Sequence, residues 1–142
     1  MTKISTFLGA AASLALLAGA AAAEPAVIFD LGGKFDKSFN ESAYNGAQRW
    51  AEETGQEYAE FELTSEAQRE QAIRRFAEQG YSPIIMVGFM SATPLSQIAP
   101  EYPDTKFVIV DAVVEAPNVR SVVFNEHEGS YLVGMLAAMA SE

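Results

Sequence analysis

Short runs of apolar residues alternate with amphipathic segments along this chain from residue 26 onward. Continuous apolar runs are typical of strands buried in a parallel sheet, whereas apolar residues spaced by three and four positions indicate helices. This pattern predicts strands at 26–29, 57–63, 83–87, 106–110 and 119–124, and helices at 38–53, 65–80, 94–99 and from about 125 to 139. The order βαβαβαββα predicts an α/β fold with a mostly parallel sheet and helices on both faces.

Two predicted helices begin with the spacing of a capping box, in which a serine and a residue three positions later bond to free backbone N–H groups. Ser38 with Glu41 and Ser65 with Gln68 have this spacing. The last predicted helix differs because it is apolar nearly all round, as in helices that are buried on several sides. We therefore expect it to be buried, and we expect the chain to be truncated before a second lobe.

The first 23 residues have the pattern of a secretory signal peptide. Lys3 is their only charged side chain, an apolar stretch follows it, and small residues occupy Ala21 to Ala23. This arrangement predicts export and cleavage after Ala23, so that residues 24–142 form the mature part. A membrane anchor is the alternative, but most of these uncharged residues are small and gain little from lipid.

The charge balance is acidic, with 19 Asp and Glu against 9 Lys and Arg and a net charge of −10. Binding to nucleic acid or to anionic lipid needs a basic face, so the balance argues against both. It favours a soluble protein that resists self-association, and we expect a monomer. The absence of cysteine excludes a disulfide, a thiolate metal site and a lipid-modified cysteine. We expect a periplasmic protein that is not a lipoprotein.

Candidate binding residues follow the predicted strands, because ligands of parallel α/β sheets bind beyond the carboxyl ends of the strands. The richest segment runs from Asp30 to Asn40. In it Asp36 can accept hydrogen bonds, Phe39 can offer a ring face and Asn40 can both donate and accept. The plainer alternatives are that Asp30 bonds only to loop amides, that Asp36 pairs with a neighbouring lysine, and that Phe39 belongs to the core.

Two further positions, Gly88 after the third strand and Asp111 after the fourth, are expected at the same edge of the sheet. Signals for catalysis are weak, because His127 is the only histidine and no nucleophile has a recognisable spacing from it. Gly32 and Gly33 do not form a phosphate-binding motif, and a metal site would need several converging ligands. We therefore expect neither an enzyme nor a bound metal or cofactor.

The segment from Val27 to Gly46 closely resembles the opening of the basic membrane protein (BMP) family, which comprises substrate-binding proteins of ABC importers, many of them specific for purine nucleosides. Two later stretches are similar to that family as well. One comprises Phe107 to Asp111 with Pro117 to Val119, and the other runs from Phe124 through Gly134 into the alanine-rich helix. The resemblance covers essentially the whole mature chain. It implies the N-terminal lobe of a two-lobed type I periplasmic binding fold that closes on its ligand.

The resemblance also implies a function: capture of nucleosides, purine nucleosides foremost, and delivery to an ABC permease at the inner membrane. By analogy Asp36 and Asn40 would hydrogen-bond the nucleoside and Phe39 would stack on its base. Asp111 would lie at the cleft, facing the sugar hydroxyls, and Asp30 would shape the loop. The complete set of expected ligand-binding residues is Asp30, Asp36, Ser38, Phe39, Asn40, Gly88 and Asp111.

Two other classes of protein stay open at this point. A metal-dependent nucleoside hydrolase also carries aspartates after its first strand, but it needs a denser carboxylate cluster than Asp30 and Asp36 provide. A stand-alone doubly wound signalling domain is compatible with the length, the acidity and Asp30. The export signal and the lack of an aspartate after the third strand argue against that reading.

Overall fold

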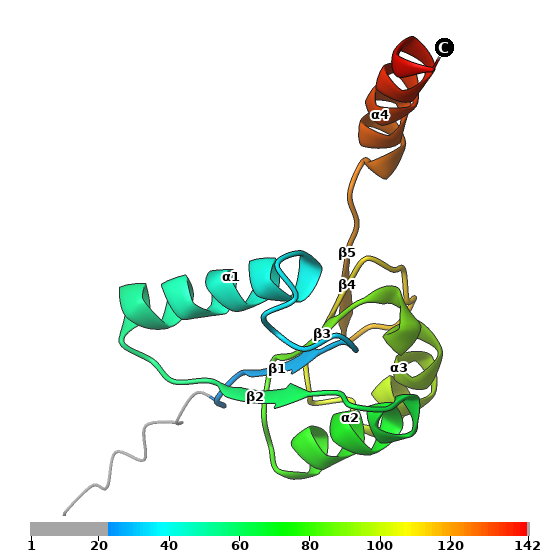
Figure 1. The fold of residues 1–142 in the computed structure, drawn as a ribbon. Coiled ribbons are helices and arrows are strands. Elements are labelled where there is room, and N and C mark those ends of the chain that lie inside the picture. Colours follow the sequence, from blue (N-terminus) through cyan, green and yellow to red (C-terminus); the bar gives the residue numbers. More distant parts are fainter. Residues whose placement is uncertain (1–22, 142) are drawn as a thin grey trace, which may run out of the picture.

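The computed structural model describes residues 23–141, so the predicted signal peptide lies outside the described residues except for Ala23. Five parallel strands form one sheet in the order β2-β1-β3-β4-β5 (Figure 1). The parallel α/β architecture is therefore confirmed. The first strand has the predicted bounds and the others are shorter than predicted. The strands are β1 (Ala26–Phe29), β2 (Ala59–Glu62), β3 (Ile84–Val87), β4 (Phe107–Val110) and β5 (Val119–Val122).

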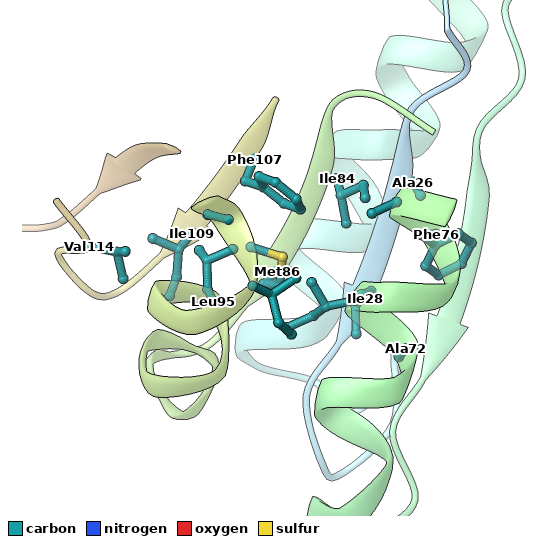
Figure 2. Packing of buried hydrophobic residues seen from close by; sticks show 14 of the residues in the cluster. Ala26, Ile28, Ala72, Phe76, Ile84, Met86, Leu95, Phe107, Ile109 and Val114 are labelled. Atoms are coloured by element: carbon teal, nitrogen blue, oxygen red, sulfur yellow. The ribbon is translucent and has the colours of Figure 1, made fainter. Parts of the chain in front are cut away.

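Two helices, α2 (Arg69–Glu78) and α3 (Ala92–Ile98), cover one face of the sheet. Successive side chains of a strand point to opposite faces, so every second strand residue points toward these helices. Figure 2 shows this layer, in which strand side chains such as Ile84 and Phe107 pack among those of the two helices. Its strand residues are Ala26, Ile28, Ile84, Met86, Phe107 and Ile109, each at most 1% exposed.

Within residues 23–141, one helix, α1 (Phe39–Thr54), covers the opposite face. It packs on Val27, Phe29 and Val87, which are buried. The residues of β4 and β5 that point to this side are partly buried, as Val110 is, or exposed, as Arg120 is. This face is therefore closed over β1 and β3 and open over β4 and β5.

The start of the second helical segment confirms one predicted capping box. Gln68 Oε1 accepts hydrogen bonds from the backbone N–H of Ser65 at 3.3 Å and of Thr64 at 2.9 Å. The segment is a short 3-10 turn, η1 (Glu66–Gln68), that continues into α2 rather than one helix. Two further 3-10 turns, η2 (Phe89–Ser91) and η3 (Ala99–Glu101), flank α3.

The last helix, α4 (Glu126–Ala140), follows β5 after a three-residue link and projects away from the sheet (Figure 1). None of its residues is buried, and Leu136 and Met139 are 66% and 80% exposed. The prediction that this helix is buried on several sides is therefore wrong within residues 23–141. Its apolar composition indicates a need for a partner but does not say which one. No helix in the same range has the length and hydropathy of a membrane span.

Candidate functional site

The strands of the sheet are all parallel, so their carboxyl ends meet at one edge. Asp30, Gly88 and Asp111 directly follow β1, β3 and β4 and are therefore brought together at this edge, as predicted. The α1 helix begins there too, and it carries Phe39 and Asn40. The structure thus assembles the predicted segments in one region, and the role of each side chain depends on its contacts.

Asn40 holds the loop after β1 in place. Its side chain is 2% exposed, and its Oδ1 accepts a hydrogen bond from Asp30 N at 3.0 Å. Its Nδ2 lies within hydrogen-bonding distance of three carbonyl oxygens, those of Asp30 at 3.2 Å, Gly33 at 3.3 Å and Leu31 at 3.5 Å. The Asn40 amide is thus fully used within the protein, and its predicted contact with a ligand stays a prediction.

Asp36 caps the N-terminus of α1. Its carboxylate accepts hydrogen bonds from the backbone N–H of Ser38 at 2.8 Å, Glu41 at 3.1 Å and Asn40 at 3.1 Å. Desolvation raises the pKa of Asp36, but these N–H donors together outweigh it and hold the pKa below its ordinary value. A negative charge at this position is also stabilised by the helix dipole.

The predicted capping box at Ser38 is therefore wrong, because the Ser38 side chain makes no capping hydrogen bond. Glu41 reaches back to the N–H of Lys37 instead, at 2.9 Å. The cause is the aspartate two residues upstream, whose carboxylate already accepts from the free N–H groups of the first turn. Aspartate commonly bonds to the backbone two residues ahead, and that preference was the sequence signal available for this role of Asp36.

An open groove of about 1290 Å³ lies beside α1 at the carboxyl edge. Phe39 lines it and is half-buried, packing against the α1-side core at the same time. Both alternatives for Phe39, a core residue and a ring available to a ligand, are thus compatible with its position. The groove is lined by Phe39, Ser42, Ala43, Gly46, Arg49, Val87, Phe89, Val110, Asp111, Val122, Phe124 and Glu126.

Asp111 lies in the wall of this groove with a φ of 74°. Left-handed backbone is uncommon for a residue other than glycine and often occurs at functional sites. Glu126, the first residue of α4, lines the same groove. A hydrogen bond to Asp111 and the repulsion between the two carboxyl groups raise the pKa of Glu126. The groove therefore carries acidic groups that can accept hydrogen bonds from hydroxyl or N–H groups.

Gly88 accommodates the side chain of Asp30. A Cβ at Gly88 would collide with the Asp30 carboxylate, and the φ of Gly88 is 104°, which side-chain-bearing residues rarely adopt. The position of the Asp30 side chain thus explains why residue 88 is a glycine, independently of the predicted role of Gly88 near a ligand. Asp30 Oδ1 also accepts from the N–H of Leu31 at 2.8 Å, but the alternative that Asp30 bonds only to loop amides is wrong, because its carboxylate also pairs with Arg69.

Sequence reasoning missed Arg69 at this edge. Its side chain is only 2% exposed, and its Nη2 lies 2.8 Å from Asp30 Oδ1. The partners are separated by 39 positions, and no local pattern predicted their contact. Among residues 23–141, no group of three His, Asp or Glu side chains is arranged to hold a metal ion.

Comparison with known proteins places the chain among solute-binding proteins. Residues 23–142 match the model of the Bmp family, described as "ABC transporter substrate-binding protein PnrA-like". A crystal structure of an ABC transporter system solute-binding protein from Aeropyrum pernix K1 superposes with a TM-score of 0.76 at 38% identity, covering 82% of this chain and 32% of that one. The fold and the family description therefore agree.

Two curated relatives extend this comparison. An uncharacterized lipoprotein of Pyrococcus furiosus is 36% identical over 116 residues, which cover 80% of this chain and 29% of the relative. The ABC transporter nucleoside-binding protein BmpA of Lactococcus lactis is 34% identical over 122 residues, which cover 82% of this chain and 35% of the relative. The chain thus spans about a third of the length of the curated relatives it matches.

Proposed function

This chain belongs to the Bmp family of ABC transporter substrate-binding proteins, and from that premise we propose that it captures nucleosides, purine nucleosides foremost, for an ABC permease at the inner membrane. Binding of a small solute outside the cytoplasm is the role of the family, whose members are generally not enzymes. The nucleoside is supported by the name of the Lactococcus lactis relative. The structural observation that supports a nucleoside ligand is the aromatic and acidic lining of the groove, which includes Phe39 and Asp111.

The chemistry of the groove suits a nucleoside. The exposed part of the Phe39 ring can stack on a base, and Asp111 can accept hydrogen bonds from ribose hydroxyls. The groove is open on one side, whereas bound small molecules usually have most of their surface buried. We propose that a second lobe supplies the opposing wall, and that ligand stabilises the closed arrangement of the two lobes. Capture in this way needs no bond to be broken.

Titration calorimetry with adenosine, guanosine, inosine, uridine and free ribose tests this proposal. We expect a purine nucleoside to bind most tightly and ribose alone to bind least. Phe39→Ala should weaken binding by about 1–3 kcal/mol, the range for stacking of a base on an aromatic ring. Phe35→Ala is a matched control, because Phe35 is 65% exposed and lies outside the groove, in the loop that precedes α1. Equal effects of the two substitutions would remove Phe39 from the binding site.

The localisation that we propose is the periplasm, with the protein monomeric and free of lipid. The names of the Pyrococcus relatives conflict with the last point, because those proteins are called lipoproteins. Our expectation rests on the sequence, whose 142 residues include no cysteine that could carry the lipid. Cell fractionation with labelled palmitate decides the matter, since label in the protein would overturn a lipid-free form.

A further inference from the structure

One buried guanidinium connects three separate loops at the carboxyl edge of the sheet. Arg69 Nη2 lies 2.8 Å from Asp30 Oδ1, in the loop after β1. Its Nη1 lies 3.1 Å from Ser91 Oγ, in the turn after β3. Its Nε and Nη2 contact the carboxylate of Glu66, in the turn after β2, at 2.9–3.0 Å. Among the hydrogen bonds of residues 23–141, Arg69 is the one side chain that contacts all three of these loops.

Two of these contacts, those with Asp30 and Ser91, lead toward segments that line the groove. Asp30 is hydrogen-bonded through its backbone to Asn40, the neighbour of Phe39 at the start of α1. Ser91 belongs to the same 3-10 turn as Phe89, and both Phe39 and Phe89 line the groove. The Asp30 carboxylate also lies against Gly88, so this network leaves it little freedom to move. Arg69 is thus linked through Asp30 and Asn40 to the segment that carries Phe39, and through Ser91 to the turn that carries Phe89.

The guanidinium is suited to this position. Burial lowers the pKa of Arg69, but hydrogen bonds to Asp30 and Glu66 outweigh that effect and raise it, so that the charge is retained. A planar guanidinium offers five N–H donors in fixed directions, which a lysine ammonium cannot reproduce. A buried charge must be paired, and the loops that supply its partners are thereby held in one arrangement.

We propose that Arg69 is a positioning residue for the ligand groove: it holds the connections after β1, β2 and β3 as one rigid wall and thereby fixes Phe39 relative to Phe89. The inference rests on the proposed function, because it assigns to this wall the recognition of an aromatic base. Arg69 itself does not line the groove. Its effect on binding is therefore indirect and passes through Asp30, Asn40 and Ser91.

Amide hydrogen exchange on the whole chain tests the positioning role without a ligand. In Arg69→Met we expect exchange to rise at least tenfold in residues 30–40 and 88–91, with β4 unchanged as an internal reference. Arg69→Lys keeps the charge but not the fork of donors, and it should give an intermediate rise. Arg74→Met is the matched control, since Arg74 lies on the same helix but pairs with Glu70 and Glu101 rather than with the loops of the wall. Wild-type exchange in both segments of Arg69→Met would overturn the proposal.

Calorimetry with guanosine and inosine then separates this proposal from the proposed function. If the wild-type protein binds, Arg69→Met should lose at least tenfold in affinity, Arg69→Lys less, and Arg74→Met less than twofold. Faster exchange with unchanged affinity would overturn the role of Arg69 in binding. If the wild-type protein binds no nucleoside even when the second lobe supplies the opposing wall, the ligand assignment fails, and hydrogen exchange alone decides whether Arg69 holds the wall. Should Arg69→Met not fold, Arg69→Lys and Ser91→Ala provide the same comparison with smaller expected rises.

Discussion

The two faces of the sheet are formed by the same five strands but are covered very differently. On the face of α2 and α3, fifteen buried residues form one continuous core. On the face of α1, the buried apolar cluster among the described residues consists only of Val27, Phe29 and Val87. The difference arises partly from the covering helices and partly from the two edge strands, which point Glu60, Glu62 and Arg120 to the α1 face.

This comparison separates stability from binding. The closed face offers no surface to a partner and holds most of the apolar area removed from water, which is the main favourable contribution to folding. The open face keeps side chains such as Val110 and Val122 accessible and contains the groove. Substitutions that are matched across the sheet should therefore have unequal effects on stability.

The largest expected contrast comes from two neighbours on β4 that point to opposite faces. Ile109→Ala on the closed face should lower the free energy of unfolding by about 2–5 kcal/mol, because it leaves a cavity in a fully buried site. Val110→Ala on the open face should cost about 1 kcal/mol, since part of that side chain already contacts solvent. Urea unfolding followed by circular dichroism measures both, and equal losses would show that the open face is covered in solution.

A second comparison concerns polar side chains that form hydrogen bonds within the protein, one on each face of the sheet. Asn118 is 7% exposed, and its Nδ2 lies 2.9–3.0 Å from the carbonyl oxygens of Ala99, Tyr102 and Thr105. Asn118→Ala should cost about 1–3 kcal/mol, because buried carbonyls lose their donor. On the α1 side, Tyr58→Phe removes one hydrogen bond with Gln48 and should cost about 1 kcal/mol or less. Urea unfolding measures the stability of both variants. A larger loss of stability for Tyr58→Phe than for Asn118→Ala would contradict the prediction that the α1 face contributes less to stability.

The smallest expected effect has the opposite sign. Gly46 lies within α1 beside the groove, and an added Cβ would meet nothing within 4 Å. Gly46→Ala should stabilise the protein by about 0.5–1 kcal/mol, because alanine loses less backbone entropy in a helix. Gly80→Ala is the control, since Gly80 has a φ of 83° and alanine there would be strained. A destabilising Gly46→Ala would indicate that this side of α1 is packed against a partner.

The sheet could be predicted from the sequence because its signal is local. The apolar runs at 26–29 and 83–87 identified two central strands to within one residue. The placement of Asp30, Gly88 and Asp111 at one edge followed from the rule for parallel strands. Hydrophobic periodicity thus predicted most of the fold and the location of the candidate site.

The roles of polar residues were harder to predict because they depend on distant partners. Arg69 bonds to residues 39 and 22 positions away, and these contacts exist only once the strand order is set. Asn118 lies between two predicted strands, and no local pattern indicates that its amide contacts three carbonyls that precede it in the chain. For α4, composition indicated burial but contained no information on the surface that would bury it.

The link between β5 and α4 is short and the helix is long, so a small rotation at the link displaces the far end of α4 by a large distance. The link consists of three residues, 123–125, and the helix beyond it has 15. At 1.5 Å per residue the arm is about 22 Å long, so a turn of about 20° at the link would sweep its tip through about 8 Å. A torsional change confined to three residues beside the groove is thereby magnified into a displacement nearly as large as the distance between two packed helices.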